Sequence, residues 1–436
     1  MAVIRPFRAL HYGRDVVGDL APVIAPPYDV IDDAHWQRLF DRSPFNVVRL
    51  ILNRAPDPYR DAAKTLASWW HQRVIIADEA PCLYYYVQNF ELPNGEARER
   101  RGLMGAVRLE RFGEGTVYPH ERTFPRAKED RLRLVEACRT NLSPIFGVYP
   151  DRADTLLPAE RRRATEAPWI DLIDEFGQRH RLWRLARSAD IAPIMAALRD
   201  APVFIADGHH RYETALAYRD QRRAGGETDP DAPHQFVLMY LASMDDAGLV
   251  ILPTHRVLRE LPHEPSRNWI ERLHAYFEVL EFPLSDAGAA DLTARLDDRS
   301  VPTLGVRVAD RNALLLLRLR DPHALDSVLA ALHPSLRSLG VTVLDALILR
   351  HILSVDCTAA AQSGALTYTH RDSEALEAVT SGRAAAAFLM RPPSMREVQE
   401  VCLAGQTMPQ KSTYFYPKLL SGLVFHSLDD SPQFAV

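Results

Sequence analysis

The sequence contains little lysine and cysteine and no long hydrophobic run. Of its 436 residues, 52 are basic, yet only four of these are lysine, and four residues are cysteine. The cysteines lie far apart without a CxxC pair, so we predict neither a zinc site nor a disulfide framework. No apolar run reaches the roughly 18 residues that cross a membrane, and the N-terminal segment carries arginines instead of a signal-peptide core. We expect a cytoplasmic protein with no membrane contact.

The sequence also lacks strong charge of one sign and the common catalytic motifs. The formal net charge is -5, which gives no general attraction to nucleic acid, so nucleic acid is an unlikely partner. There is no HExxH, GxSxG or GxGxxG, so zinc-peptidase, serine-hydrolase and Rossmann assignments lose their usual support. With 47% hydrophobic and 25% charged residues, the chain has the composition of a folded globular protein.

Helical and strand patterns alternate along the chain, which predicts an α/β (α+β) fold. We expect three parts, residues 1–112, 113–260 and 261–436, with a break near LPHEPS at 261–266. Two strands are expected at 82–92 and 103–112, joined by the charged segment PNGEARERRG as an exposed connection. Helices are expected at several places, among them 58–74, 285–297 and 322–340.

The sharpest local feature is a turn of five residues, Asp207, Gly208, His209, His210 and Arg211. A buried strand at 202–206 runs into this turn, and a helical pattern follows it directly. The backbone N–H groups and positive dipole of a helix N-terminus bind phosphate, and an arginine grips phosphate oxygens in pairs. Asp207 can also help to hold a metal ion. The alternative is that the aspartate only caps the helix and the histidines are surface residues.

A second feature is Pro-His-Glu at 119–121, followed by a basic helix entry. Glu121 is the candidate general base for a bound hydroxyl, with His120, Arg122 and Lys128 as candidate substrate-binding neighbours. The alternative is a solvated, salt-bridged start of a helix.

A third feature is MPQKSTYFYPK at 408–418, which holds two of the four lysines. It is not a P-loop, because the residues before the lysine read GQTMPQ, but Lys411 and Ser412 are candidates for binding an anion. An aromatic packing segment is the alternative. His255 and Arg256, in PTHR, are weaker candidates for substrate binding.

Spread over nearly the whole chain are the segments APPYDVI, HERT, KEDRL, NLSPIFGVYPD, ADGHHRYETA, LPTHRVL and MPQKSTYFYPKL. In these segments the chain resembles the family catalogued as domain of unknown function 1015.

The region 113–245 also resembles the ParB/sulfiredoxin fold, and within it the free serine kinases, in which a Pro-His-Glu segment precedes an Asp-Gly-His-His-Arg turn. This resemblance implies a ParB/sulfiredoxin-like central domain with additional N-terminal and C-terminal α/β regions. It implies Glu121 as base on a serine hydroxyl, and Asp207, His209, His210 and Arg211 as the nucleotide-phosphate site. The chain departs from the kinases in the longer interval between the motifs and in its terminal additions. No cysteine lies in the turn, which argues against sulfiredoxin chemistry.

The leading hypothesis is therefore an Mg²⁺-dependent phosphotransferase that uses ATP or ADP, with free L-serine as the best single acceptor. A phosphohydrolase acting on phosphoserine and a non-catalytic nucleotide sensor are the alternatives.

Overall fold

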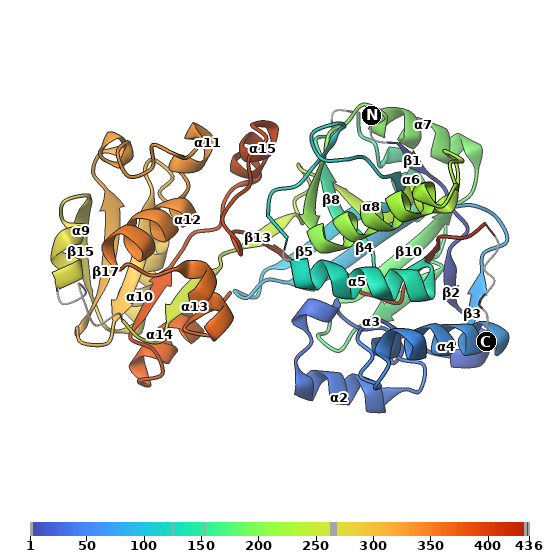
Figure 1. Ribbon diagram of the computed structural model, residues 1–436, viewed down its shortest axis with the longest axis horizontal. Helices are drawn as coiled ribbons and strands as arrows, with labels where there is room; N and C mark the ends of the chain where they lie inside the picture. The colour runs from blue at the N-terminus through green and yellow to red at the C-terminus, as the bar shows by residue number, and fades with distance from the viewer. Residues whose placement is uncertain (1–2, 124, 152, 262–267, 431–433, 435–436) are drawn as a thin grey trace. The chain divides into compact units, whose positions relative to one another are not determined.

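The computed structural model describes residues 3–123, 125–151, 153–261, 268–430 and 434. The chain forms two compact units (Figure 1). Unit 1 comprises Met1–Pro119, Thr123–Val250 and Pro417–Val436, and unit 2 comprises His120–Arg122 and Ile251–Tyr416. The break expected at 261–266 lies almost wholly outside the described residues, and the three-part division stays a prediction. Among the described helices, none combines the length and the apolar character needed to cross a bilayer.

Unit 1 is built on a nine-stranded mixed sheet with the order β6-β11-β8-β12-β5-β4-β10-β9, and β1 also pairs with β5. The strands are β1 (Ile4–Arg5), β4 (Leu83–Glu91), β5 (Ala97–Arg108), β6 (Val117–Tyr118), β8 (Ile145–Tyr149), β9 (Ile170–Ile173), β10 (Arg179–Leu185), β11 (Val203–Asp207) and β12 (Phe236–Ser243). Shorter strands are β2 (Leu10–Tyr12), β3 (Ile75–Ala77), β7 (Thr140–Asn141) and β21 (His426–Ser427), and β13 (Val250–Leu252) begins at the last residue of this part of unit 1 and continues into unit 2.

The central hairpin of β4 and β5 differs from the sequence expectation in its second strand. The segment PNGEARERRG was expected to be an exposed connection, but β5 already begins at Ala97, and Arg100 is fully buried. Arg100 pairs with Gln88 across the hairpin and donates to its side-chain oxygen at 3.1 Å. A buried polar partner therefore turns a charged segment into sheet, which charge patterning alone does not reveal.

Helices cover unit 1 because their apolar faces pack on the sheet or on one another. In Figure 1, α5 and α8 run side by side across one face of the sheet. Tyr212 and Ala215 of α8 belong to the buried core of that sheet. Asp57 caps α4, and Pro58 occupies its first turn, as at many helix starts. The helices are α1 (Arg14–Val17), α2 (Asp33–Arg42), α3 (Val48–Ile51), α4 (Pro58–His71), α5 (Pro125–Cys138), α6 (Leu157–Arg163), α7 (Ser188–Leu198) and α8 (His209–Ala224).

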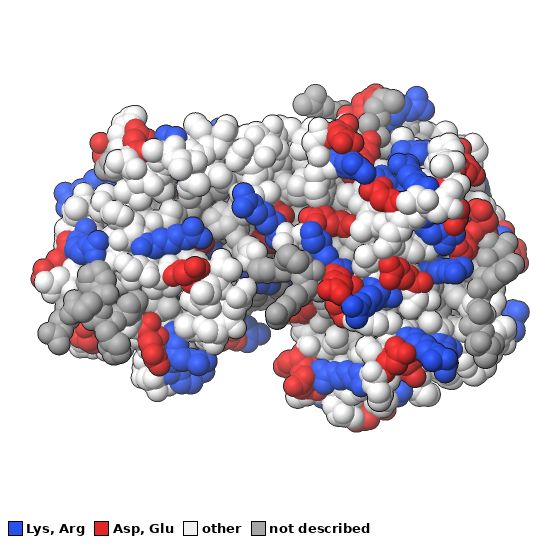
Figure 2. Space-filling model, in the orientation of Figure 1, with Lys and Arg blue, Asp and Glu red and all other residues white. Residues whose placement is uncertain are grey.

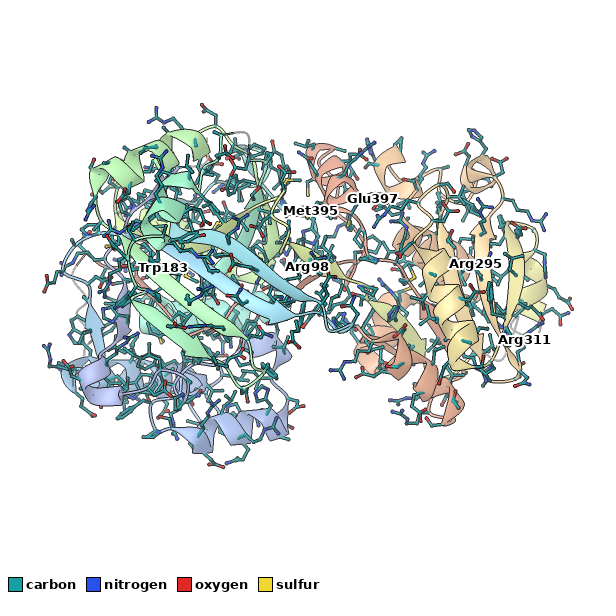
Figure 3. All side chains as sticks on the ribbon, turned by 180° about the vertical axis from the view of Figure 1, so that it is seen from behind. Arg98, Trp183, Arg295, Arg311, Met395 and Glu397 are labelled. Atoms are coloured by element: carbon teal, nitrogen blue, oxygen red, sulfur yellow. The ribbon has the colours of Figure 1, made fainter. Side chains whose placement is uncertain are left out.

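Unit 2 is a six-stranded sheet with the order β15-β17-β16-β19-β14-β18. Its strands are β14 (His255–Leu258), β15 (Phe277–Pro283), β16 (Thr303–Val308), β17 (Ala313–Leu319), β18 (Leu366–Thr369) and β19 (Ala386–Leu389), and β20 (Tyr414–Tyr416) lies outside this sheet. Its helices are α9 (Trp269–Leu273), α10 (Asp286–Leu296), α11 (Pro334–Arg337), α12 (Gly340–Thr342), α13 (Cys357–Ser363), α14 (Asp372–Thr380) and α15 (Met395–Leu403). Figure 3 shows this unit from behind, with Arg295 on α10.

The helix expected at 322–340 does not form as one element. A 3-10 turn covers Pro322–Leu325, and α11 begins only at Pro334. Each of these starts at a proline, which has no N–H to continue a preceding helix. A π-helix follows at Val343–Ile352. With sheets and helices interleaved in both units, the expected mixed α/β class is confirmed.

Candidate functional site

The turn of unit 1 begins where β11 ends. A bulge in the pairing of β11 with β8 lies between Ile205 and Asp207, and such irregularities change the direction of the next side chain. Gly208 has φ of 96° and ψ of 28°, a left-handed conformation that favours glycine. A Cβ at this position would lie 2.9 Å from Nη2 of Arg211, so any other residue would have to displace this guanidinium. Gly208 supplies no side-chain cap to α8, whose N-terminus keeps the anion-binding character of an uncapped helix.

Two cations hold the carboxylate of Asp207. Arg211 donates from Nη2 to Oδ2 at 2.6 Å, and Lys418 donates from Nζ to Oδ1. Arg211 also donates to the carbonyl of Pro144, which fixes its guanidinium. Burial opposes the ionisation of Asp207, but the charges of Lys418 and Arg211 outweigh it and hold its pKa well below the usual range. The three side chains therefore form a fixed, charged cluster with a net charge of +1.

Lys418 was not among the residues predicted for this site. Its backbone is anchored by the buried hairpin, because Arg100 donates to the carbonyl of Pro417 at 2.6 Å. Gln88 donates to the carbonyl of Lys418 at 3.5 Å. The scarcity of lysine was a usable signal, since 408–418 holds two lysines, but the sequence did not reveal which of them meets the turn.

Other predicted residues of unit 1 lie on the same helix pair. His209 is buried and His210 is half-buried at the start of α8. Lys128 of α5 donates to Glu213 of α8 at 2.7 Å. This ion pair joins the two helices about one helical turn after His209. Lys128 therefore lies near the Asp207–Arg211 segment, and its ion-pair partner is Glu213.

A small cavity of about 50 Å³ borders the turn and gathers four of the motif segments. Tyr28 comes from APPYDVI, Arg131 from KEDRL, Ser143 from NLSP, and Arg211 from the turn. The guanidinium of Arg131 lies 4.3 Å from the ring centre of Tyr28. Burial raises the pKa of Tyr28, so its hydroxyl keeps its proton at neutral pH. Sequence reasoning treated these segments as separate, and the sheet brings them together.

The second and third sequence features meet inside unit 2. Met408 donates its backbone N–H to the carbonyl of His120 at 2.8 Å, in a parallel bridge with Glu121. The ring of His120 lies 2.7 Å from Oγ1 of Thr413. The backbone N–H of Ser412 donates to Oε1 of Glu121 at 3.2 Å. Glu121 and Ser412 were both predicted, and the structure places them in direct contact.

The other residues of unit 2 that were predicted to bind substrate form hydrogen bonds within the unit. Arg122 donates to the hydroxyl of Thr407 at 3.2 Å, and Arg256 donates to the carbonyl of Thr254 at 2.6 Å. His255 is buried, its Nδ1 accepts from the N–H of Met390 at 3.0 Å, and burial lowers its pKa to about 4. Their role in substrate binding stays a prediction.

Lys411 is exposed and has φ of 57°, a conformation that few non-glycine residues adopt. The hydroxyl of Ser412 donates to the carbonyl of Pro409 and is thus part of the same loop. An anion-binding role for these two residues stays a prediction as well.

The acidic side chains of the turn determine whether a magnesium ion fits there. Among the described residues, no group of three His, Cys, Asp or Glu side chains could hold a metal ion. Both oxygens of Asp207 already accept from cations. The described side chains therefore do not form a metal site by themselves, and the metal role of Asp207 stays a prediction.

Basic and acidic side chains are mixed on the visible surface of unit 1. Figure 2 shows Lys and Arg side chains interspersed with Asp and Glu over the face of unit 1 that it presents. That face of unit 1 therefore shows no broad basic surface.

The comparisons with known proteins identify the family. The model of the family described as Protein of unknown function (DUF1015) matches residues 4–342, more than half of the chain. The chain therefore belongs to this family, as the motifs predicted. No curated protein matches the chain.

Several solved structures are similar to the chain at low levels. A free serine kinase in complex with AMP is 13% identical with a TM-score of 0.34, covering 71% of this chain and 88% of that chain. A mutant free serine kinase in complex with ADP is 13% identical with a TM-score of 0.36, covering 71% and 89%. A conserved hypothetical protein from Pyrococcus furiosus is 14% identical with a TM-score of 0.33, covering 70% and 90%. Such TM-scores decide neither a ligand nor an activity.

Proposed function

We propose that the turn of unit 1 binds the phosphate of a nucleotide, and that the protein transfers phosphate between this nucleotide and a small hydroxyl compound. One observation carries the proposal: Lys418 and Arg211 flank Asp207 at the uncapped N-terminus of α8. ATP or ADP is the proposed nucleotide, and free L-serine is the best single acceptor.

The electrostatics of the turn favour a phosphate. The cluster of Asp207, Arg211 and Lys418 carries a net charge of +1, and the helix N-terminus adds about half a positive charge. A phosphate entering here gains both cations as donors, while Asp207 keeps them oriented before it arrives. Groups that are fixed in advance lose little entropy on binding, and they stabilise the charge that develops on a transferring phosphoryl group. His209 and His210 belong to the same proposed site.

For the acceptor we retain Glu121 as the proposed general base. Its Oε1 accepts from the N–H of Ser412 at 3.2 Å, and its Oε2 has no hydrogen-bond partner among the residues that the structure describes. A carboxylate held by one oxygen keeps the other for a proton. In the proposed reaction the acceptor hydroxyl attacks phosphorus, and its proton passes to Glu121. The bond to the bridging oxygen of the nucleotide breaks, and that oxygen keeps the electron pair.

Phosphorus NMR of the full chain tests the proposal. ATP, ADP or pyrophosphate is offered with L-serine, and phosphoserine is offered alone, each with and without Mg²⁺. We expect a phosphomonoester signal that requires both the donor and serine and that disappears in the variants D207A and E121Q. The matched control is D200A, which removes an exposed carboxylate of unit 1 and is expected to react normally.

The other outcomes select the alternatives. Release of inorganic phosphate from phosphoserine without nucleotide would make the protein a phosphohydrolase. Unchanged spectra, with a nucleotide that still binds and raises the Tm of both the wild type and E121Q, would make it a sensor and would contradict both catalytic assignments.

A further inference from the structure

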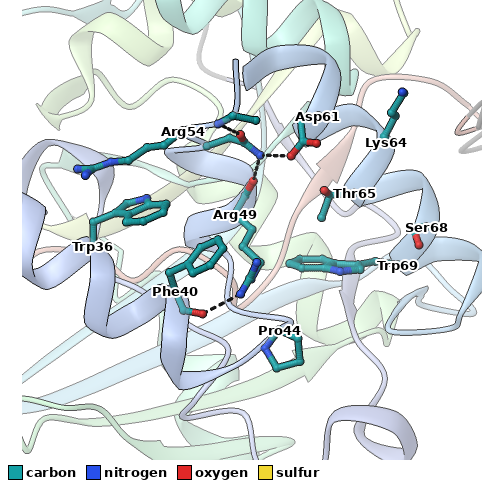
Figure 4. A pocket seen from close by; sticks show the side chains of 12 residues that line it. Trp36, Phe40, Pro44, Arg49, Arg54, Asp61, Lys64, Thr65, Ser68 and Trp69 are labelled. Atoms are coloured by element: carbon teal, nitrogen blue, oxygen red, sulfur yellow. Dashed lines mark hydrogen bonds between the residues drawn. The ribbon is translucent and has the colours of Figure 1, made fainter. Parts of the chain in front are cut away.

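The largest cavity described in unit 1 lies away from the turn, among the helices of the N-terminal part. It has a volume of about 630 Å³, which is within the usual range for small-molecule sites. In Figure 4, side chains of α2 lie on one side and those of α4 on the other, with Arg49 between Phe40 and Trp69.

Two arginines of this cavity are fixed by aromatic rings. Trp36 and Phe40 stack with their ring centres 4.7 Å apart. The guanidinium of Arg54 lies 4.4 Å from the ring centre of Trp36, and that of Arg49 lies 3.5 Å from the ring centre of Phe40. The order is therefore Arg54, Trp36, Phe40, Arg49, which we call the cation ladder. A stacked guanidinium keeps the N–H groups in its plane for an anion.

Hydrogen bonds hold both ends of the cation ladder. Arg49 donates from Nη2 to the carbonyl of Phe40 at 2.8 Å, and Arg54 donates from Nη2 to Asp33 at 2.7 Å. The two positive groups are thus in place before a ligand binds, so an anion that meets them orders few side chains.

The third cation is Lys64, one of the four lysines. It is exposed and forms no ion pair with any residue in the described part of the chain. The acidic residue in the lining is Asp61, whose Oδ2 accepts from Asn53 at 2.7 Å. The lining therefore carries three positive charges and one negative charge, and with Asp33, the ion-pair partner of Arg54, the group keeps a net charge of +1. Lys64 has no role in the proposed function, and this cavity gives it one.

The remaining lining is apolar or carries hydroxyls. Trp69 and Phe40 provide rings, Pro44 provides a flat apolar surface, and Thr65 and Ser68 provide hydroxyls. We propose that this cavity binds a small organic oxyanion, a carboxylate or a phosphate ester, that carries a flat apolar body. The oxyanion meets Arg54, Arg49 and Lys64, and the apolar body lies against Trp69. The inference does not rest on the proposed function.

Calorimetry and tryptophan fluorescence of the full chain test this site, because Trp36 and Trp69 line it. The probes are phenyl phosphate, benzoate, the neutral benzyl alcohol and inorganic phosphate. We expect phenyl phosphate, benzoate or both to bind with a Kd below about 1 mM and to change the fluorescence. Comparison of phenyl phosphate with benzoate distinguishes a site for phosphate esters from a site for carboxylates. Equal binding of benzyl alcohol, or no binding of either anion, would overturn the proposal.

Variants locate the binding. K64A and R54A remove exposed cations, and each should weaken the binding about fivefold or more, while T65W should fill the cavity and abolish it. The matched control R60A removes an exposed cation of the same helix α4 outside the lining, and is expected to stay within about twofold of the wild type. Binding that survives K64A, R54A and T65W unchanged would overturn the proposal. D207A should leave binding in this cavity intact even if it abolishes phosphate transfer. The experiment can therefore contradict the proposed function without contradicting the oxyanion site, and the reverse.

Discussion

In the turn of unit 1 a carboxylate pairs with two cationic side chains, whereas in the loop of unit 2 a carboxylate accepts from a backbone N–H. Asp207 is held by two cations, through both of its oxygens. Glu121 is held through one oxygen by the N–H of Ser412. The first arrangement fixes a charged cluster that can receive an anion, and the second leaves a carboxylate oxygen that can accept a proton. The same kinds of residue thus suit binding in one unit and proton transfer in the other.

Acid should destabilise unit 2 through its buried histidine His255, and this is the largest effect that we predict. Burial lowers the pKa of His255 from 6.5 to about 4. The folded state keeps the neutral ring, whereas the unfolded chain takes up a proton near pH 6.5. Unit 2 therefore has its full free energy of unfolding above pH 6.5. This free energy decreases by about 3 kcal/mol as the pH falls toward 4.

Hydrogen exchange of β14 as a function of pH measures this loss. In H255Q the free energy of opening of β14, obtained from the protection of its amides, should lose most of its change between pH 6.5 and 4. The control H426Q changes a histidine of unit 1 whose pKa burial also lowers to about 4, and it should leave the pH dependence of β14 as it is. A β14 that is equally acid-sensitive in H255Q would contradict the prediction.

K418M should destabilise unit 1 by about 2 kcal/mol. It leaves the mostly buried carboxylate of Asp207 with one of its two ion-pair partners, Arg211, and removing a partner from a buried ion pair is costly. K411M removes an exposed lysine of the same segment and should change the free energy of unfolding by less than about 0.5 kcal/mol. Urea denaturation with hydrogen exchange of β11 measures both, and equal effects would remove the distinction between the two lysines.

G208A should cost about 1–2 kcal/mol and weaken nucleotide binding. Alanine is strained at φ of 96°, and its Cβ would push against Arg211. Gly226 has the same φ of 96° at the other end of α8, with nothing within 4 Å of a Cβ. G226A therefore carries the backbone strain alone, and it should leave nucleotide binding unchanged in a titration. Equal losses of affinity would place the effect in the backbone and not in Arg211.

E121Q should have the smallest effect on stability and a large one on catalysis. Glutamine still offers an oxygen to the N–H of Ser412, so the free energy of unfolding should change by less than about 0.5 kcal/mol. Because E121Q removes the proposed general base, it should lower kcat by about 100-fold or more, measured as phosphate transfer at a saturating donor concentration. An active E121Q would leave unit 2 with a purely structural carboxylate.

Local sequence determined most helices and strands. The spacing of apolar residues placed α4 close to its observed bounds, and the pattern at 285–297 gave α10. The sequence did not predict the start of β5, because burial of Arg100 depends on Gln88 of the neighbouring strand. The prediction of a single helix at 322–340 was also wrong, because the segment contains two shorter elements that each begin at a proline.

The turn at 207–211 and its glycine were readable from the sequence alone, because a strand, a left-handed residue and a helix follow one another within a few residues. Contacts between distant segments were not readable. Only the tertiary structure decided that Lys418, 211 residues away, meets Asp207, and that Ser412 meets Glu121 across 291 residues. The pairing of strands sets such contacts, and strand pairing depends on burial and register over the whole sheet and not on the local order of residues.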